Sequence, residues 1–138
     1  MGMYTELHFN AELRSDVPQA VIDTLNYMLE SDILCSPPSG LPSHDLFHTD
    51  RWQVMLRMDS YYFDADTHST LRKDNINGRR YLCIRCNVKN YCMEIEKFVD
   101  WITPYLDKLP GDFLGFKRYE ETENPTLLYM PPGGESSG

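Results

Sequence analysis

Three of the chain's four cysteines lie in the stretch YLCIRCNVKNYC, residues 81–92. Cys83 and Cys86 have the C-x-x-C spacing of zinc sites and thioredoxin-type redox pairs, which need both thiolates on a turn or at a helix start. The alternation around them instead predicts a β-strand over residues 79–88, where side chains three apart point to opposite faces. Opposed thiols cannot share a zinc ion or a disulfide. The sequence therefore predicts a structural strand, with no metal and no cofactor.

The histidines offer two further chemistries. His44 and His48 in HDLFH have the i, i+4 spacing of a helical metal pair but lack the glutamate of H-E-x-x-H. HST at His68 matches the H-x-T/S element of two-histidine phosphoesterases, which need a second such element, and this chain has none. Asp64 and Asp66 could face a divalent cation from one strand, but two carboxylates without further ligands are weak evidence for a metal site. We expect a non-enzymatic protein and keep the phosphoesterase as a remote alternative.

The elements that must position such residues follow from hydrophobic periodicity. Leu7, Phe9 and Leu13 alternate with polar residues, which predicts a half-buried strand. Apolar residues at helical spacing predict amphipathic helices over residues 17–31 and after Asn90, which can cap the second one. The dipeptide Asn77-Gly78 is a strong hairpin signal. The other expected strands cover residues 52–58, 61–68, 79–88, 113–120 and 126–130.

This order reads strand-helix-strand-strand, twice. It predicts an α+β fold: a duplicated βαββ, with a six-stranded, mainly antiparallel sheet and two helices on one face. A ferredoxin-like sheet with extra edge strands is the alternative. We expect one domain over residues 1–130, with halves 3–75 and 79–130, and a flexible tail over 131–138. In this reading Cys86 points into the core, where Ala11 points in the first half.

Charge and targeting signals limit the function classes. The 138 residues include 21 acidic and 13 basic side chains, a net charge of −8. This disfavours nucleic-acid binding unless the charge is sharply segregated, and it suits a basic target. The first residues show no signal peptide, and no apolar run approaches the ~20 residues that span a bilayer. We therefore expect a cytoplasmic protein with reduced thiols and no membrane partner.

The sheet face that the helices leave open is the predicted binding surface. By strand phase it should carry tyrosine and arginine side chains, which are enriched in interfaces. The candidate binding residues are Arg57, Tyr61, Tyr81, Cys83, Arg85 and Tyr119. We expect a binding protein that forms a homodimer and uses this face for a protein partner or ligand. The alternative is a small-molecule-binding domain with a pocket between the two halves.

Three stretches carry a resemblance to known sequences. FHTDRWQVML, SYYFD and NYCMEIEKFVDWITPYL resemble small bacterial and phage proteins that share an R-W-x-x-M-L strand and an N-Y-x-x-E-I-E-x-F-x-x-W-I helix. The likeness covers residues 3–129. No enzymatic activity is attached to these proteins, so the resemblance identifies no catalytic residues. It implies a phage- or prophage-encoded inhibitor that sequesters a host protein or ligand. In topology only, the doubled plan is similar to effector-binding domains of the GyrI type.

Overall fold

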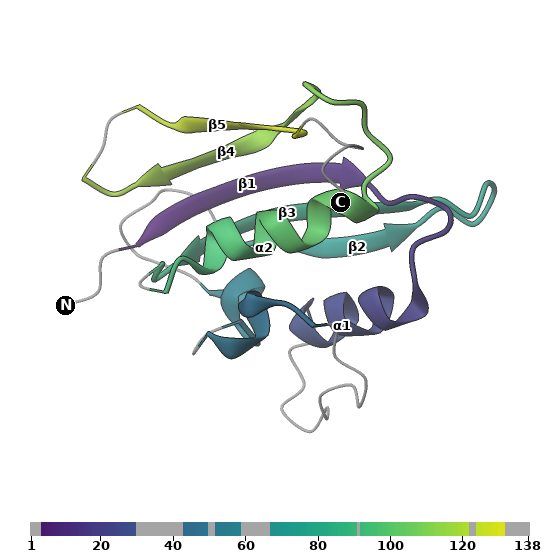
Figure 1. Ribbon diagram of the computed structural model, residues 1–138, viewed down its shortest axis with the longest axis horizontal. Coiled ribbons are helices and arrows are strands. Elements are labelled where there is room, and N and C mark those ends of the chain that lie inside the picture. The colour runs from purple at the N-terminus through teal and green to yellow at the C-terminus, as the bar shows by residue number, and fades with distance from the viewer. Residues whose placement is uncertain are drawn as a thin grey trace.

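The computed structural model describes residues 4–29, 43–49, 52–58, 67–90, 92–121 and 124–131. Within these ranges the fold is α+β, with two α-helices, three short 3₁₀ helices and five strands (Figure 1). In chain order the elements are β1 (Thr5–Glu12), α1 (Gln19–Leu29), η1 (Asp45–His48), η2 (Met55–Arg57), β2 (Thr70–Lys73), β3 (Arg80–Val88), α2 (Glu94–Ile102), η3 (Thr103–Tyr105), β4 (Phe113–Tyr119) and β5 (Thr126–Tyr129).

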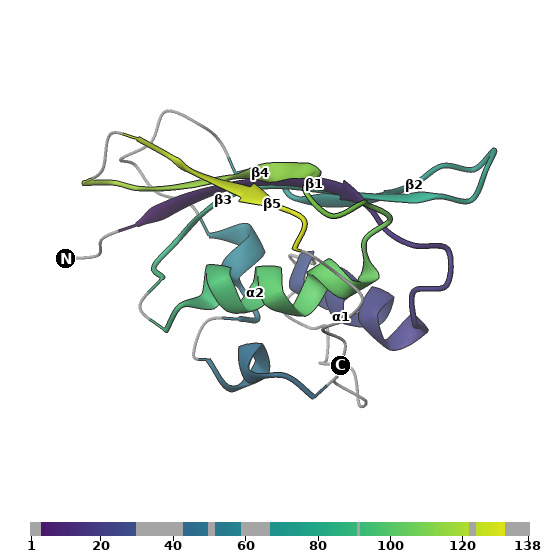
Figure 2. The same ribbon diagram turned by 45° about the horizontal axis from the view of Figure 1, so that its top comes forward.

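The strands form one antiparallel sheet in the order β2-β3-β1-β4-β5. Both helices lie on the same face of this sheet, and the other face carries no helix of the described chain (Figures 1 and 2). The predicted α+β class, with two helices against an antiparallel sheet, is confirmed. The described strands number five, and the predicted six-stranded, duplicated βαββ plan is not confirmed.

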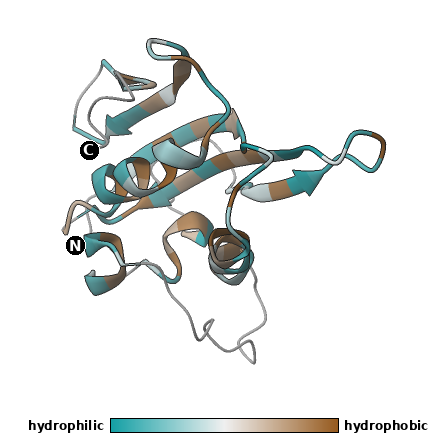
Figure 3. Cartoon of the chain, turned by 45° about the vertical axis from the view of Figure 1, so that its right-hand side comes forward, coloured by the Kyte–Doolittle hydropathy of each residue, from teal (hydrophilic) through white to brown (hydrophobic). Residues whose placement is uncertain are grey.

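The core lies between the sheet and the helices. Leu7, Phe9 and Ala11 of β1 are buried, and the ring of Phe9 meets that of Phe98 on α2 edge-on, with centroids 6.0 Å apart. Both helices carry apolar residues on one side and hydrophilic residues on the other (Figure 3). The alternation that predicted the first strand and the 3.6-residue periodicity of the helices therefore describe two sides of one apolar layer.

The strand predicted over residues 52–58 is wrong. Residues 52–54 form a turn and η2 follows, so this segment is a short helical stretch. Trp52, Met55 and Leu56 are buried at spacings of three and four, whereas Val54 is 41% exposed. The alternation of Trp52, Val54 and Leu56 suggested a strand, but burial follows the helical spacing because this segment packs against α1 and β3.

The hairpin predicted at Asn77-Gly78 is confirmed and joins β2 to β3. Gly78 has φ +75°, a left-handed conformation, and its N–H donates to the Asp74 carbonyl oxygen at 2.8 Å. The amide of Arg79 donates to the side chain of Asn77 at 2.8 Å. In all three overall views the tip of this hairpin projects beyond the rest of the molecule (Figures 1 to 3).

Side-chain bonds hold α2 in place. The Asn90 side chain accepts the N–H of Ile95 in the first turn at 2.7 Å, although the N-cap position falls at Met93 and not at Asn90 as predicted. Glu96 on α2 pairs with Lys117 on β4. Partial burial acts to raise the pKa of Glu96, but the hydrogen bonds from Lys117 and Asn90 outweigh it and hold this pKa below its ordinary value. The helix is therefore fixed to the sheet by an ionised carboxylate.

Candidate functional site

The candidate site is the sheet face turned away from the helices, which we call the open face. Directly opposite residues of antiparallel strands share a face, so the register assigns its members from strand to strand. His8 on β1 lies opposite Arg85 on β3 and Phe116 on β4, and Phe116 lies opposite Leu127 on β5. Side chains of this phase are those that alternate with the buried core residues.

These side chains form one row across the sheet. His68 extends it past Arg85, because the two residues exchange backbone hydrogen bonds of 2.8 and 3.1 Å. We call His68, Arg85, His8, Phe116 and Leu127 the central row. Four intervals of about 4.8 Å make it roughly 19 Å long. The His8 and Phe116 rings stack at its centre, with centroids 4.5 Å apart and planes 16° apart.

The β4–β5 end of the open face is apolar and aromatic. Phe113 lies opposite Tyr129, and their rings meet edge-on with centroids 5.8 Å apart. Phe113, Leu127 and Tyr129 are 53%, 48% and 52% exposed, and Phe116 is half-buried beside them. Exposed apolar groups gathered in this way mark interaction surfaces more often than isolated ones do.

The charge of the open face differs from that of the whole chain. The Glu6 carboxylate is bonded to His8 at 2.8 Å and to Arg118 at 3.2 Å, which offsets its charge. Glu12 on the same face lies 3.4 Å from Arg79, and the carboxylate of Glu120, just beyond β4, accepts the N–H of Tyr4 at 2.8 Å. Arg85 is exposed, and no ion pair to it is found among the described residues. Among the described strand residues of this face, the charge that is not ion-paired is therefore cationic.

At the β2–β3 end an arginine lies over an aromatic ring. Arg72 lies opposite Tyr81, with its guanidinium carbon 4.6 Å from the ring centroid. This cation–π contact holds the planar guanidinium against the sheet without reducing its charge. Arg72 and Arg85 thus present two cations on adjacent strands, a short distance from the aromatic end.

The structure brings together three of the six predicted binding residues. Tyr81, Cys83 and Arg85 alternate with the buried residues of β3 and lie on the open face. Tyr61 lies outside the described residues.

Two of the predicted binding residues need correction. Arg57 belongs to η2 and not to a strand, and its guanidinium donates to the carbonyl oxygens of Met28 at 3.0 Å and Gln53 at 3.2 Å. It therefore connects α1 to η2 on the helix side of the sheet. Tyr119 lies opposite Thr5, which shares the helix-covered face with Leu7, so Tyr119 is not on the open face either.

Sequence reasoning missed the members of the open face that lie beyond the central strands. Arg72, Phe113, Phe116 and Leu127 were not predicted as site residues. A two-residue turn at Asn77-Gly78 would set Asp74 opposite Tyr81, whereas the hairpin closes with Asp74 opposite Arg79 and so sets Arg72 opposite Tyr81. The exact partner of Tyr81 could therefore not be counted from the turn.

The side chains of Cys83 and Cys86 lie on opposite faces of β3. Cys83 lies opposite Asn10 on the open face and Cys86 lies opposite Leu7 in the core, so the two point away from each other as the strand phase predicts. Burial raises the pKa of the Cys86 thiol far above its ordinary value. Among the described residues, no group of three or more His, Cys, Asp or Glu side chains is placed to hold a metal ion.

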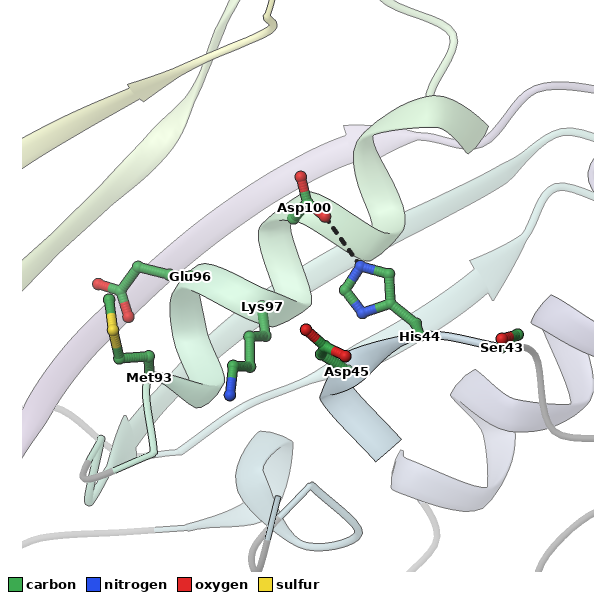
Figure 4. Close-up of a pocket in the computed structure, with 7 residues that line it drawn as sticks. All are labelled: Ser43, His44, Asp45, Met93, Glu96, Lys97 and Asp100. Carbon is green, nitrogen blue, oxygen red and sulfur yellow. Dashed lines mark hydrogen bonds and ion pairs between the residues drawn. The ribbon is translucent and has the colours of Figure 1, made fainter. Parts of the chain in front are cut away.

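A groove lies on the helix side of the sheet. It has a volume of about 500 Å³ and is lined by Ser43, His44, Asp45, Met93, Glu96, Lys97 and Asp100 (Figure 4). The Nδ1 of His44 accepts the Leu46 N–H at 3.0 Å, so the ring proton sits on Nε2 and is donated to Asp100 at 2.9 Å. Both ring nitrogens are occupied, which leaves His44 no lone pair for a general base.

Comparisons with protein-family models, curated proteins and solved structures found nothing that matches this chain. In the part of the chain that the structure describes, no helix is both long enough and apolar enough to cross a membrane.

Proposed function

We propose that this chain is a non-enzymatic binding protein whose open face receives an anionic macromolecule. One observation supports this most directly. Among the described strand residues of the open face, the carboxylates of Glu6 and Glu12 are ion-paired, whereas Arg72 and Arg85 are exposed beside an apolar, aromatic surface. Arginine and aromatic side chains dominate the energetics of protein interfaces.

The net charge of −8 does not oppose this proposal. At physiological ionic strength the charge–charge interaction is screened over about 8 Å. The acidic residues of α2, such as Asp100, lie on the far side of the sheet, and packed layers are about 10 Å apart. A ligand on the open face therefore interacts mainly with the arginines. The net charge predicts a basic target, whereas the distribution of charge favours an acidic one.

The two alternative functions, a phosphoesterase and a small-molecule-binding domain, have less support in the described residues. The phosphoesterase requires two histidines facing one substrate, and His68 lies at the end of the central row with the paired His8 two strands away. The small-molecule alternative fits the groove beside His44, which combines residues of both halves. Most ligand pockets are lined mainly by apolar residues, whereas Met93 is the one apolar residue among the described residues that line this groove.

The proposed role needs binding alone. A protein that covers an anionic surface of a host component can block it without any chemical step. This keeps the inhibitory role expected from the phage resemblance as part of the proposal.

Charge reversal on the open face tests the proposal. The probes are poly-L-glutamate and a fluorescein-labelled oligothymidylate of about twelve nucleotides, within the range bound by single sheet domains. Arg72→Glu/Arg85→Glu should weaken binding of both polymers at least about ten-fold by fluorescence anisotropy, since each lost charged contact costs about 1 kcal/mol or more.

The matched control is Arg14→Glu/Lys108→Glu, which makes the same change in net charge outside the open face. It should change the affinity by less than the open-face pair does. If neither polymer binds the unmodified protein at about 100 µM, the weak limit of non-specific binding to nucleic acid, the proposal is wrong. An equal loss in both double variants would also overturn it, because it would show that only net charge matters.

A further inference from the structure

We propose that the anionic partner is a single-stranded nucleic acid that crosses the strands along the central row. This inference rests on the proposed function of the open face and names its ligand. It follows from three features of the described residues: the stacked rings, the length of the row and the segregation of charge around β2 and β3.

The rings of the open face offer surfaces for nucleobases. His8 and Phe116 already stack in parallel, and a base can continue such a stack on either side. Phe113 and Tyr129 lie beside them, each about half exposed. Stacking on aromatic side chains is how open sheets bind single strands, because unpaired bases expose their π-faces and duplexes do not. An acidic protein surface would make no comparable use of parallel rings.

The central row is long enough for two or three stacked bases. Its five side chains extend over roughly 19 Å, from His68 beside β3 to Leu127 on β5, at about 4.8 Å per strand. Sheets of four strands stack two or three bases in this manner. Arg85 lies next to His8 in the row, so a phosphate can contact the guanidinium while a base lies against the rings.

The positive charge of the chain is concentrated at the β2–β3 end of the row. Residues 67–90 contain six basic side chains and one acidic side chain, Asp74, a local charge of +5. Since the whole chain carries −8, the remaining residues sum to −13. The carboxylate of Asp74 accepts the N–H of Ile76 within the turn at 2.8 Å. This is the sharp segregation under which an acidic protein can bind a phosphate backbone.

The projecting hairpin extends this cationic surface away from the acidic helices (Figures 2 and 3). Arg72 is fixed over Tyr81, and Arg79 at the base of the hairpin shares its open-face phase, whereas Lys73 alternates to the helix side. A strand that leaves the central row on the β3 side would therefore continue over basic residues, and one that leaves on the β5 side would continue over the aromatic end.

The test compares three probes by fluorescence anisotropy: an oligothymidylate, the same oligonucleotide paired with its complement, and poly-L-glutamate of equal charge. The single strand should bind about ten-fold or more tightly than the other two. Phe116→Leu keeps apolar bulk but removes the ring, and it should weaken only the single strand, by about ten-fold. Tyr129→Ser, at an exposed position, is a second ring variant that the fold should tolerate.

The salt dependence gives a separate readout. For the single strand, Arg72→Glu/Arg85→Glu should lower the slope of log affinity against log salt concentration by about 1.4, from two lost phosphate contacts at about 0.7 each. Both ring variants should leave this slope unchanged.

The outcomes separate the two proposals. Equal affinity for all three probes, with both ring variants unchanged, would overturn the nucleic-acid inference and leave an acidic protein surface as the partner of the open face. A duplex that binds as tightly as the single strand would also overturn it, because stacking would then play no part. If no probe binds, both proposals are wrong.

Discussion

Gly115 on β4 lies directly beneath the candidate site, and its replacement tests how the sheet is built there. A Cβ atom at this position would lie 1.9 Å from the carbonyl oxygen of His8 and 2.9 Å from the Cα of Phe9. Both contacts are with the backbone of β1, which is the central strand and cannot rotate away. The residue also has φ +153°, a conformation that is essentially restricted to glycine.

Two costs therefore add in Gly115→Ala. Backbone strain of this kind costs about 1–3 kcal/mol. Forcing an extra carbon into a packed site costs about 1–3 kcal/mol more. We expect the free energy of unfolding to fall by roughly 2–6 kcal/mol, a large part of the 5–15 kcal/mol typical of a domain. Urea denaturation followed by circular dichroism measures this change.

Gly78→Ala is the matched control. Gly78 also has a positive φ, +75°, but a Cβ there would meet nothing within 4 Å. It should cost only the strain of a left-handed residue, about 1–2 kcal/mol. Equal destabilisation by the two substitutions would refute the argument, because it would show that contact with β1 adds nothing.

Two further predictions concern ionisable groups. The lowered pKa of Glu96 stabilises the fold above its ordinary pKa of 4.5, and this contribution is lost as the pH falls through the lower, folded-state value. Glu96→Gln should therefore reduce the loss of stability on acidification measured by urea titrations, and an unchanged pH profile would contradict the role of the Lys117 pair. Iodoacetamide should modify half-buried Cys83 well before Cys86, whose burial raises its pKa, as mass spectrometry of peptides can show. Simultaneous modification would mean that β3 does not separate them.

The central part of the fold could be predicted from the sequence because strand phase and turn chemistry agree there. Phe9 and Ile84 lie opposite each other on β1 and β3 and both are buried, as the alternation within each strand requires. The Asn77-Gly78 dipeptide located the neighbouring hairpin, although its loop is two residues longer than a two-residue turn. Where two local signals agree, tertiary contacts rarely override them.

The same reasoning failed where the apolar residues of a segment fit both the helical and the strand periodicity. Trp52, Met55 and Leu56 fit helical spacing, while the residues between them also fit an alternating strand, so only packing decides. Tyr119 shows the same difficulty on β4, where Phe113-Leu114-Gly115-Phe116 gives no alternation from which the outward face can be read. The partner's charge could not be read from composition either, since it depends on which carboxylates are ion-paired.

The irregularity of β4 produces the aromatic part of the candidate site. Phe113 and Phe116 are three residues apart and would lie on opposite faces of a regular strand. The register shifts by one residue between Phe113 and Gly115, so both rings lie on the face of their partners Tyr129 and Leu127. The extra residue, Leu114, is 1% exposed and belongs to the core. The bulge therefore moves one aromatic ring to the open face while keeping the apolar layer filled. The close approach of Gly115 to His8 holds β4 against β1 at the point where the rings of Phe116 and His8 stack. The bulge in β4 thus makes the sheet irregular and at the same time places the aromatic rings that the proposed ligand would contact.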